Sequence, residues 1–179
     1  RIPAIENHEQ TGFKEDYECQ LLYFVRDMLE WSDPNSIKAI VLKLLNKKHP
    51  IFKRLAYHTI NKHFDALGHI FFNSQRNPLS VWVKHEMFVL LQRHATDFSE
   101  PEIERIIHWI ETEAYSLKRE ISKNITYAMR FRAYKKREWL TALLPSKNAK
   151  VLSLYEKYTK INNTEITHPG FSSWHETSN

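Results

Sequence analysis

The chain of 179 residues has a net charge of +5 and is 42% apolar, a composition that suits one domain or one slice of a longer repeat array. Its 3 glycines argue against a β-rich fold with many tight turns, and its single cysteine excludes an internal disulfide framework and indicates a reducing compartment, the cytoplasm. No stretch approaches the ~18 consecutive apolar residues of a membrane span, so we expect no membrane partner.

The first part of the chain predicts three helices with proline at their boundaries. Residues 1–14 are expected to form an extended leader, and apolar residues at helical spacing predict a helix over 15–31. Asp33 is a suitable N-cap for the second helix, with proline directly after it. Pro50 disfavours helical geometry at the residue before it and so opens a third helix, for which Gly68 is the expected C′ residue.

Four further helical segments follow in the rest of the chain. Helical periodicity predicts a helix over residues 79–94. Ser99 and Glu102 have the spacing of a capping box and are expected to open the next helix. Residues 117–144 predict either one long helix or two shorter ones, and residues 148–161 predict the last helix.

Two segments of similar pattern, 36–68 and 79–113, each predict a helix, a short polar joint and a second helix. Stacked pairs of this kind form α-solenoids, and we therefore expect an all-α, HEAT-like solenoid segment of stacked antiparallel helix pairs. An irregular helical bundle is the alternative, since any antiparallel bundle gives a similar pattern. The expected organisation is the leader, a helical-repeat domain over 15–162 and an irregular tail over 163–179.

The polar residues of the chain do not predict a catalytic or metal site. Zinc ligands on one helix face lie three or four residues apart, whereas His58 and His63 lie five apart. A Glu-x-x-His pair, Glu165 with His168, falls in the proline-bearing tail rather than on a long helix. With no nucleophile elbow and no glycine-rich phosphate loop either, we expect a protein that is not an enzyme and has no metal or cofactor.

Residues 118–137 combine many cations with interleaved aromatic residues. On a helix, Tyr127, Phe131 and Tyr134 share one stripe, which suits the binding of nucleic-acid bases and phosphates. The same pattern is typical of an aromatic core stripe with a solvated basic flank, or of a surface for an acidic protein. The candidate binding residues are Lys123, Arg130, Arg132, Lys135, Lys136 and Arg137.

The polar tail contains two aromatic residues, Phe171 and Trp174. Aromatic residues, Trp above all, are enriched at binding hot spots. We therefore expect these two residues to contact a protein partner or another module of a longer chain.

Four features mark the last quarter of the chain: residues 137–144, Val151, the Tyr-Glu-Lys-Tyr run at 155–158 and the segment 168–174. In these features it resembles a C-terminal helical region of large bacterial anti-phage defence proteins. Such proteins join a STAND-type NTPase or a sirtuin-like NADase to a long helical repeat array. The resemblance implies a non-catalytic scaffold or sensor region that binds a protein partner or another module. A nucleic-acid-binding helical domain is the alternative.

Overall fold

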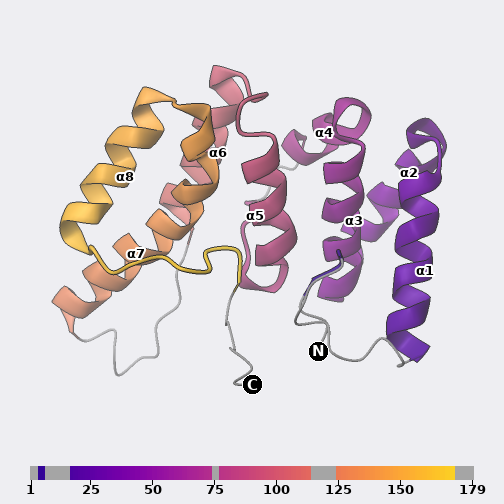
Figure 1. The fold of residues 1–179 in the computed structure, drawn as a ribbon, viewed down its shortest axis with the longest axis horizontal. Coiled ribbons are helices and arrows are strands. Elements are labelled where there is room, and N and C mark those ends of the chain that lie inside the picture. Colours follow the sequence, from indigo (N-terminus) through magenta and orange to yellow (C-terminus); the bar gives the residue numbers. More distant parts are fainter. Residues whose placement is uncertain (1–3, 7–16, 74–76, 114–123, 172–179) are drawn as a thin grey trace. The chain divides into compact units, whose positions relative to one another are not determined.

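The computed structural model describes residues 4–6, 17–73, 77–113 and 124–171. Within these ranges the chain forms eight α-helices and no strand, which confirms the prediction of an all-α fold (Figure 1). No helix in this part of the chain combines the length and the apolar character needed to cross a membrane. The chain divides into two compact units. Unit 1 comprises residues 1–76 and 80–90, and unit 2 comprises residues 77–79 and 91–179.

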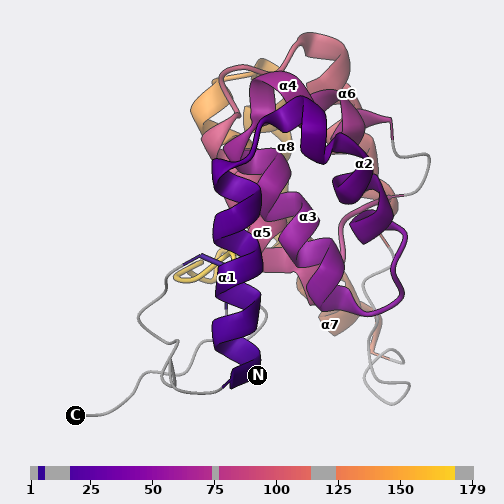
Figure 2. The ribbon, with the colours of Figure 1, turned by 90° about the vertical axis from the view of Figure 1, so that its right-hand side faces the viewer.

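Unit 1 is built around its third helix. Its elements are α1 (Tyr17–Trp31), α2 (Pro34–Leu45), α3 (Pro50–Lys62), α4 (Phe64–Phe72), a 3-10 turn η1 (Val81–Val83) and most of α5 (Lys84–Arg93). Helix α3 contacts α1, α2, α4 and η1 (Figures 1 and 2). Because it is enclosed in this way, every residue from Leu55 to Asn61 is buried.

The predicted breaks at the two prolines are confirmed by their caps. The Asp33 carboxylate accepts a hydrogen bond of 3.0 Å from the Ser36 N–H, and Pro34 is the first residue of α2. His49 caps α3 in the same way, since its Nδ1 accepts a hydrogen bond from the Ile51 N–H. Each cap satisfies one of the amide groups that a helix N-terminus leaves without an intrahelical partner.

The predicted helix end at Gly68 is wrong. Helix α3 already ends at Lys62, because His63 leaves helical geometry (φ −114°, ψ 39°) and its Nε2 lies 3.0 Å from the Leu29 carbonyl oxygen. Helix α4 then runs through Gly68. The glycine makes room for an aromatic ring one turn earlier, since an added β-carbon would lie 2.9 Å from Cζ of Phe64.

Unit 2 contains α6 (Glu100–Thr112), α7 (Ile125–Leu143), a 3-10 turn η3 (Leu144–Ser146) and α8 (Ala149–Ile161). The capping box at the start of α6 is confirmed, with Ser99 and Glu102 hydrogen-bonded to each other. Of the segment predicted over 117–144, residues Ile125–Leu143 form a single α-helix. Helices α7 and α8 pack side by side as an antiparallel pair, joined through η3 and a left-handed Lys147 (Figure 1).

Candidate functional site

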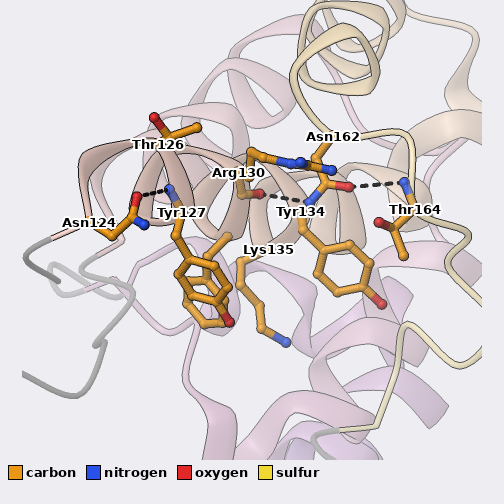
Figure 3. A pocket seen from close by; sticks show the side chains of 9 residues that line it. Asn124, Thr126, Tyr127, Arg130, Tyr134, Lys135, Asn162 and Thr164 are labelled. Atoms are coloured by element: carbon orange, nitrogen blue, oxygen red, sulfur yellow. Dashed lines mark hydrogen bonds between the residues drawn. The ribbon is translucent and has the colours of Figure 1, made fainter. Parts of the chain in front are cut away.

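A groove of about 610 Å³ lies on α7 in unit 2 (Figure 3). Its floor comes from the first half of α7, and its wall from the segment that follows α8. It is open to solvent, since most of the polar residues that line it are exposed. The lining residues are Asn124, Thr126, Tyr127, Arg130, Phe131, Tyr134, Lys135, Asn162 and Thr164.

The aromatic stripe predicted from the sequence lines this groove. Tyr127 is 49% exposed, and Phe131 and Tyr134 are half-buried. The buried face of the first half of α7 is instead made by Ala128 and Ala133. Figure 3 shows Tyr127, Tyr134 and Lys135 projecting to the same side of the helix. The three rings therefore form a partly exposed floor rather than the centre of a core.

Two of the predicted cations line the groove, and they differ in their partners. The Lys135 Nζ donates a hydrogen bond of 2.7 Å to Glu138 and lies 5.8 Å and 5.4 Å from the ring centres of Phe131 and Tyr134. Its charge is thus balanced within α7. Arg130 is exposed and forms no ion pair with any described residue.

Lys136 points away from the groove into a polar cluster between helices. Its Nζ lies 3.2 Å from the Glu111 carboxylate and 3.3 Å from the Tyr158 hydroxyl. The Tyr158 hydroxyl in turn donates to Glu111 at 2.6 Å. Burial, and then the hydrogen bond to Glu111, raise the pKa of the Tyr158 phenol well above its ordinary value. This cluster links α6, α7 and α8, so Lys136 has a structural partner on each neighbouring helix.

Arg137 is buried and holds the wall of the groove in place. Its guanidinium donates to the backbone carbonyls of Asn162 and, at 2.7 Å, of Thr164. It also lies 5.5 Å from the ring centre of Tyr155. Because both carbonyls belong to the segment after α8, one side chain of α7 fixes that segment against the helix.

Asn162 joins the same wall to the floor (Figure 3). Its Nδ2 donates to the Arg130 carbonyl at 3.0 Å, and its Oδ1 accepts a hydrogen bond from the Thr164 N–H at 2.9 Å. The amide therefore bridges α7 and the wall, which leaves the Thr164 side chain exposed at the rim.

The remaining predicted residues lie elsewhere. Arg132 is exposed but does not line the groove. Phe171 is half-buried, and its backbone N–H donates to the His168 carbonyl at 3.2 Å. Lys123 and Trp174 fall outside the described residues.

Four polar lining residues were not predicted from the sequence: Asn124, Thr126, Asn162 and Thr164. For Asn124 a signal existed, because asparagine is a favoured N-cap and its Oδ1 accepts from the Tyr127 N–H at 3.0 Å at the start of α7. For Asn162 and Thr164 there was none, since their place depends on how α8 folds back on α7.

Comparisons with known proteins do not indicate what the groove binds. The chain matches no family model, no curated protein and no solved structure. The described residues also contain no group of three or more His, Cys, Asp or Glu side chains placed to hold a metal ion.

Proposed function

We propose that this chain is a non-catalytic helical binding module, and that the groove on α7 holds an extended segment of a protein partner. The observation that carries the proposal is the row of Tyr127, Phe131 and Tyr134 along an open groove beside Arg130. Tyrosine and arginine, together with tryptophan, are enriched at the hot spots of protein interfaces. A groove of this volume has room for a few side chains.

The lining chemistry specifies the kind of segment. The aromatic rings suit apolar or proline side chains, which pack against rings in extended and polyproline conformations. Arg130 forms no ion pair with any described residue. Its guanidinium therefore suits a carboxylate of the partner that lies next to those apolar or proline side chains. Asn124 and Thr164 at the rim can hydrogen-bond the partner's backbone.

Nucleic acid binding is the second candidate, because aromatic rings beside cations also suit unstacked bases. The internal partners of Lys135, Lys136 and Arg137 weigh against it. If only Arg130 and Arg132 meet phosphates, the slope of log K against log salt is about −1.4 for a single strand. If all six predicted cations take part, that slope is about −4.

A selection from a displayed peptide library tests the proposal. We expect enriched peptides that share an apolar or proline core beside an acidic residue. Tyr127→Ala and Arg130→Glu should each weaken binding by about 2 kcal/mol, or roughly thirtyfold in Kd. Arg132→Glu is the matched control, because it makes the same charge change two residues away, outside the groove.

Three results would contradict the proposal. Peptides that bind Arg130→Glu and the unchanged chain equally would place their site elsewhere. A selection without enrichment would remove the support for a peptide groove. Binding of single-stranded DNA or RNA with a slope near −4 would favour the nucleic acid candidate.

The proposal extends to the setting of the module. We place it in the cytoplasm as a HEAT-like segment of stacked helix pairs, with residues 36–68 and 79–113 as the two pairs that the sequence pattern indicates. The packing of α2 against α3 within unit 1 supports the first of these pairs. The resemblance to defence proteins would make it their sensor or scaffold arm. Its partner would then be a phage component or another module of the same polypeptide, and a library made from phage coding sequences is the first to use.

A further inference from the structure

Helix α1 buries one face inside unit 1 and presents a second, apolar face to solvent. On the inner face Leu29 is buried, and the buried Arg26 donates to the Ile5 carbonyl at 3.0 Å. The outer face consists of five large apolar residues. Their exposed fractions are Tyr17 75%, Leu21 50%, Phe24 61%, Met28 55% and Trp31 89%.

The spacing of the outer residues is that of a helix–helix seam. The steps between them are four, three, four and three residues, which is the 3.5-residue repeat that keeps one stripe against a partner helix. The stripe covers only about two heptads, too few for an isolated coiled coil. Here α1 is already held as a helix by its inner face, so pairing would not have to form the helix.

The area of the stripe approaches what a stable interface requires. At ~200 Å² for a whole aromatic side chain, the exposed fractions of Tyr17, Phe24 and Trp31 amount to roughly 450 Å². Leu21 and Met28 add to this area. Each partner in a standard-size interface contributes about 800 Å², and the largest exposed apolar patch of a typical monomer is about 300–600 Å². The aromatic rings alone thus supply more than half of one partner's share.

The order of the residues makes the stripe self-complementary. It runs aromatic, aliphatic, aromatic, aliphatic, aromatic and is symmetric about Phe24. The surface of a two-fold interface must be self-complementary, because each copy presents the same surface to the other. We propose that α1 is a self-association surface, on which a second copy of this chain docks antiparallel with Phe24 against Phe24.

This register is also compatible with the charges beside the stripe. It brings Asp27 next to Gln20 of the second copy, and Glu18 next to Ser32 of the second copy. No acidic residue then faces another acidic residue across the seam. An antiparallel pair also places the N-terminal end of each helix dipole beside the C-terminal end of the other. This inference concerns unit 1 and is independent of the groove on α7.

Sedimentation equilibrium of the whole chain over a wide concentration range tests the proposal first. We expect a dimer whose mass falls to that of one chain in Phe24→Glu, because the central residue meets its own copy. Leu42→Glu is the matched control, since Leu42 is a 42% exposed apolar residue of α2 in the same unit. It should remain dimeric. Circular dichroism checks that both variants keep their helices.

Cysteine cross-linking tests the register, in a Cys19→Ala background that removes the native thiol. Oxidised Phe24→Cys should form a dimer linked to itself, since a disulfide needs β-carbons about 4 Å apart. Leu21→Cys mixed with Met28→Cys should cross-link, and neither should do so alone.

Each other outcome overturns a stated part of the proposal. A monomer at every concentration would show that no second copy binds the stripe. A dimer that survives Phe24→Glu would place the interface on another surface. Efficient cross-linking of Leu21→Cys with itself would exclude the antiparallel register.

Discussion

Arg54 in α3 donates two hydrogen bonds of 2.8 Å to the carboxylate of Glu86 in α5, although 32 residues separate the two in the chain. The same carboxylate accepts a 3.0 Å hydrogen bond from the Ile5 N–H. The Glu86 side chain is only 2% exposed. One buried charge therefore ties three separate segments of unit 1 together.

Replacing Glu86 with Gln should destabilise unit 1 strongly. The variant removes the carboxylate charge from a buried ion pair with Arg54, and breaking such a pair typically costs about 3–5 kcal/mol. Urea denaturation followed by circular dichroism measures the loss. Glu104→Gln is the control, because its ion pair with Lys150 is exposed and worth less than about 1 kcal/mol. Equal losses in the two variants would contradict the role given to Glu86.

Arg137→Lys should loosen the wall of the groove. An ammonium group cannot reproduce the planar fork that reaches both Asn162 and Thr164, so we expect a loss of about 1–3 kcal/mol in unfolding free energy. Peptides selected on the unchanged chain should also bind the variant more weakly, as calorimetry would show. Arg132→Lys should change neither property, since Arg132 is exposed and off the groove. Undiminished peptide affinity in Arg137→Lys would contradict a role of the wall in binding.

His58 should make the stability of the chain depend on pH. Burial lowers the pKa of this imidazole below its ordinary 6.5 and outweighs Glu30, whose carboxylate lies 2.5 Å from Nε2 and raises it. Below about pH 6.5 the unfolded chain binds a proton that the folded chain does not. The unfolding free energy should therefore fall as pH decreases from 6.5 toward the folded pKa, and stay level above 6.5.

The contribution of His58 is isolated by comparison with His58→Gln, because the chain has 10 histidines. Urea denaturation between about pH 5 and pH 8 should give a shallower slope for the variant. One proton accounts for at most about 1.4 kcal/mol per pH unit. Identical slopes would show that His58 titrates alike in both states.

Gly68→Ala should fail to stabilise α4, although alanine usually gains about 1 kcal/mol over glycine inside a helix. The added β-carbon would meet three ring atoms of Phe64 at 2.9–3.1 Å. In a Phe64→Leu background the ring is gone, and the usual gain should return. A double-mutant cycle by urea denaturation should thus show coupling of about 1 kcal/mol. Additive effects would mean that the ring moves aside freely.

Local signals in the sequence predicted most of the helices but not the division between α3 and α4, because such signals involve only a few neighbouring residues. Asp33 and the Ser99–Glu102 pair are caps in the structure as the sequence predicts. Gly68 was misread, since a glycine that ends a helix and a glycine that admits a ring look alike in sequence. In the same way, the spacing of residues in α1 indicated a helix but not that two separate stripes share it.

The candidate site was predictable only in part. The aromatic row could be read from the spacing of Tyr127, Phe131 and Tyr134, because helical periodicity fixes which residues share a face. The partners of Arg137 could not, since they lie 25 and 27 residues further on and depend on the turn between α7 and α8. The predicted cations share a charge but pack differently, since Arg130 and Lys135 line the groove, Lys136 links three helices and Arg137 anchors the wall.

The position of the groove wall bears on how this region is subdivided for experiments. A boundary drawn at Ile161, the last residue of α8, would keep every described helix intact. It would nevertheless remove the two carbonyls to which Arg137 donates and the Asn162 amide that meets Arg130. Such a shortened chain would retain its helical spectrum and carry an unanchored arginine in place of a finished binding surface. If this shortened chain failed to bind peptides, the cause would be the missing wall and not the properties of the intact groove.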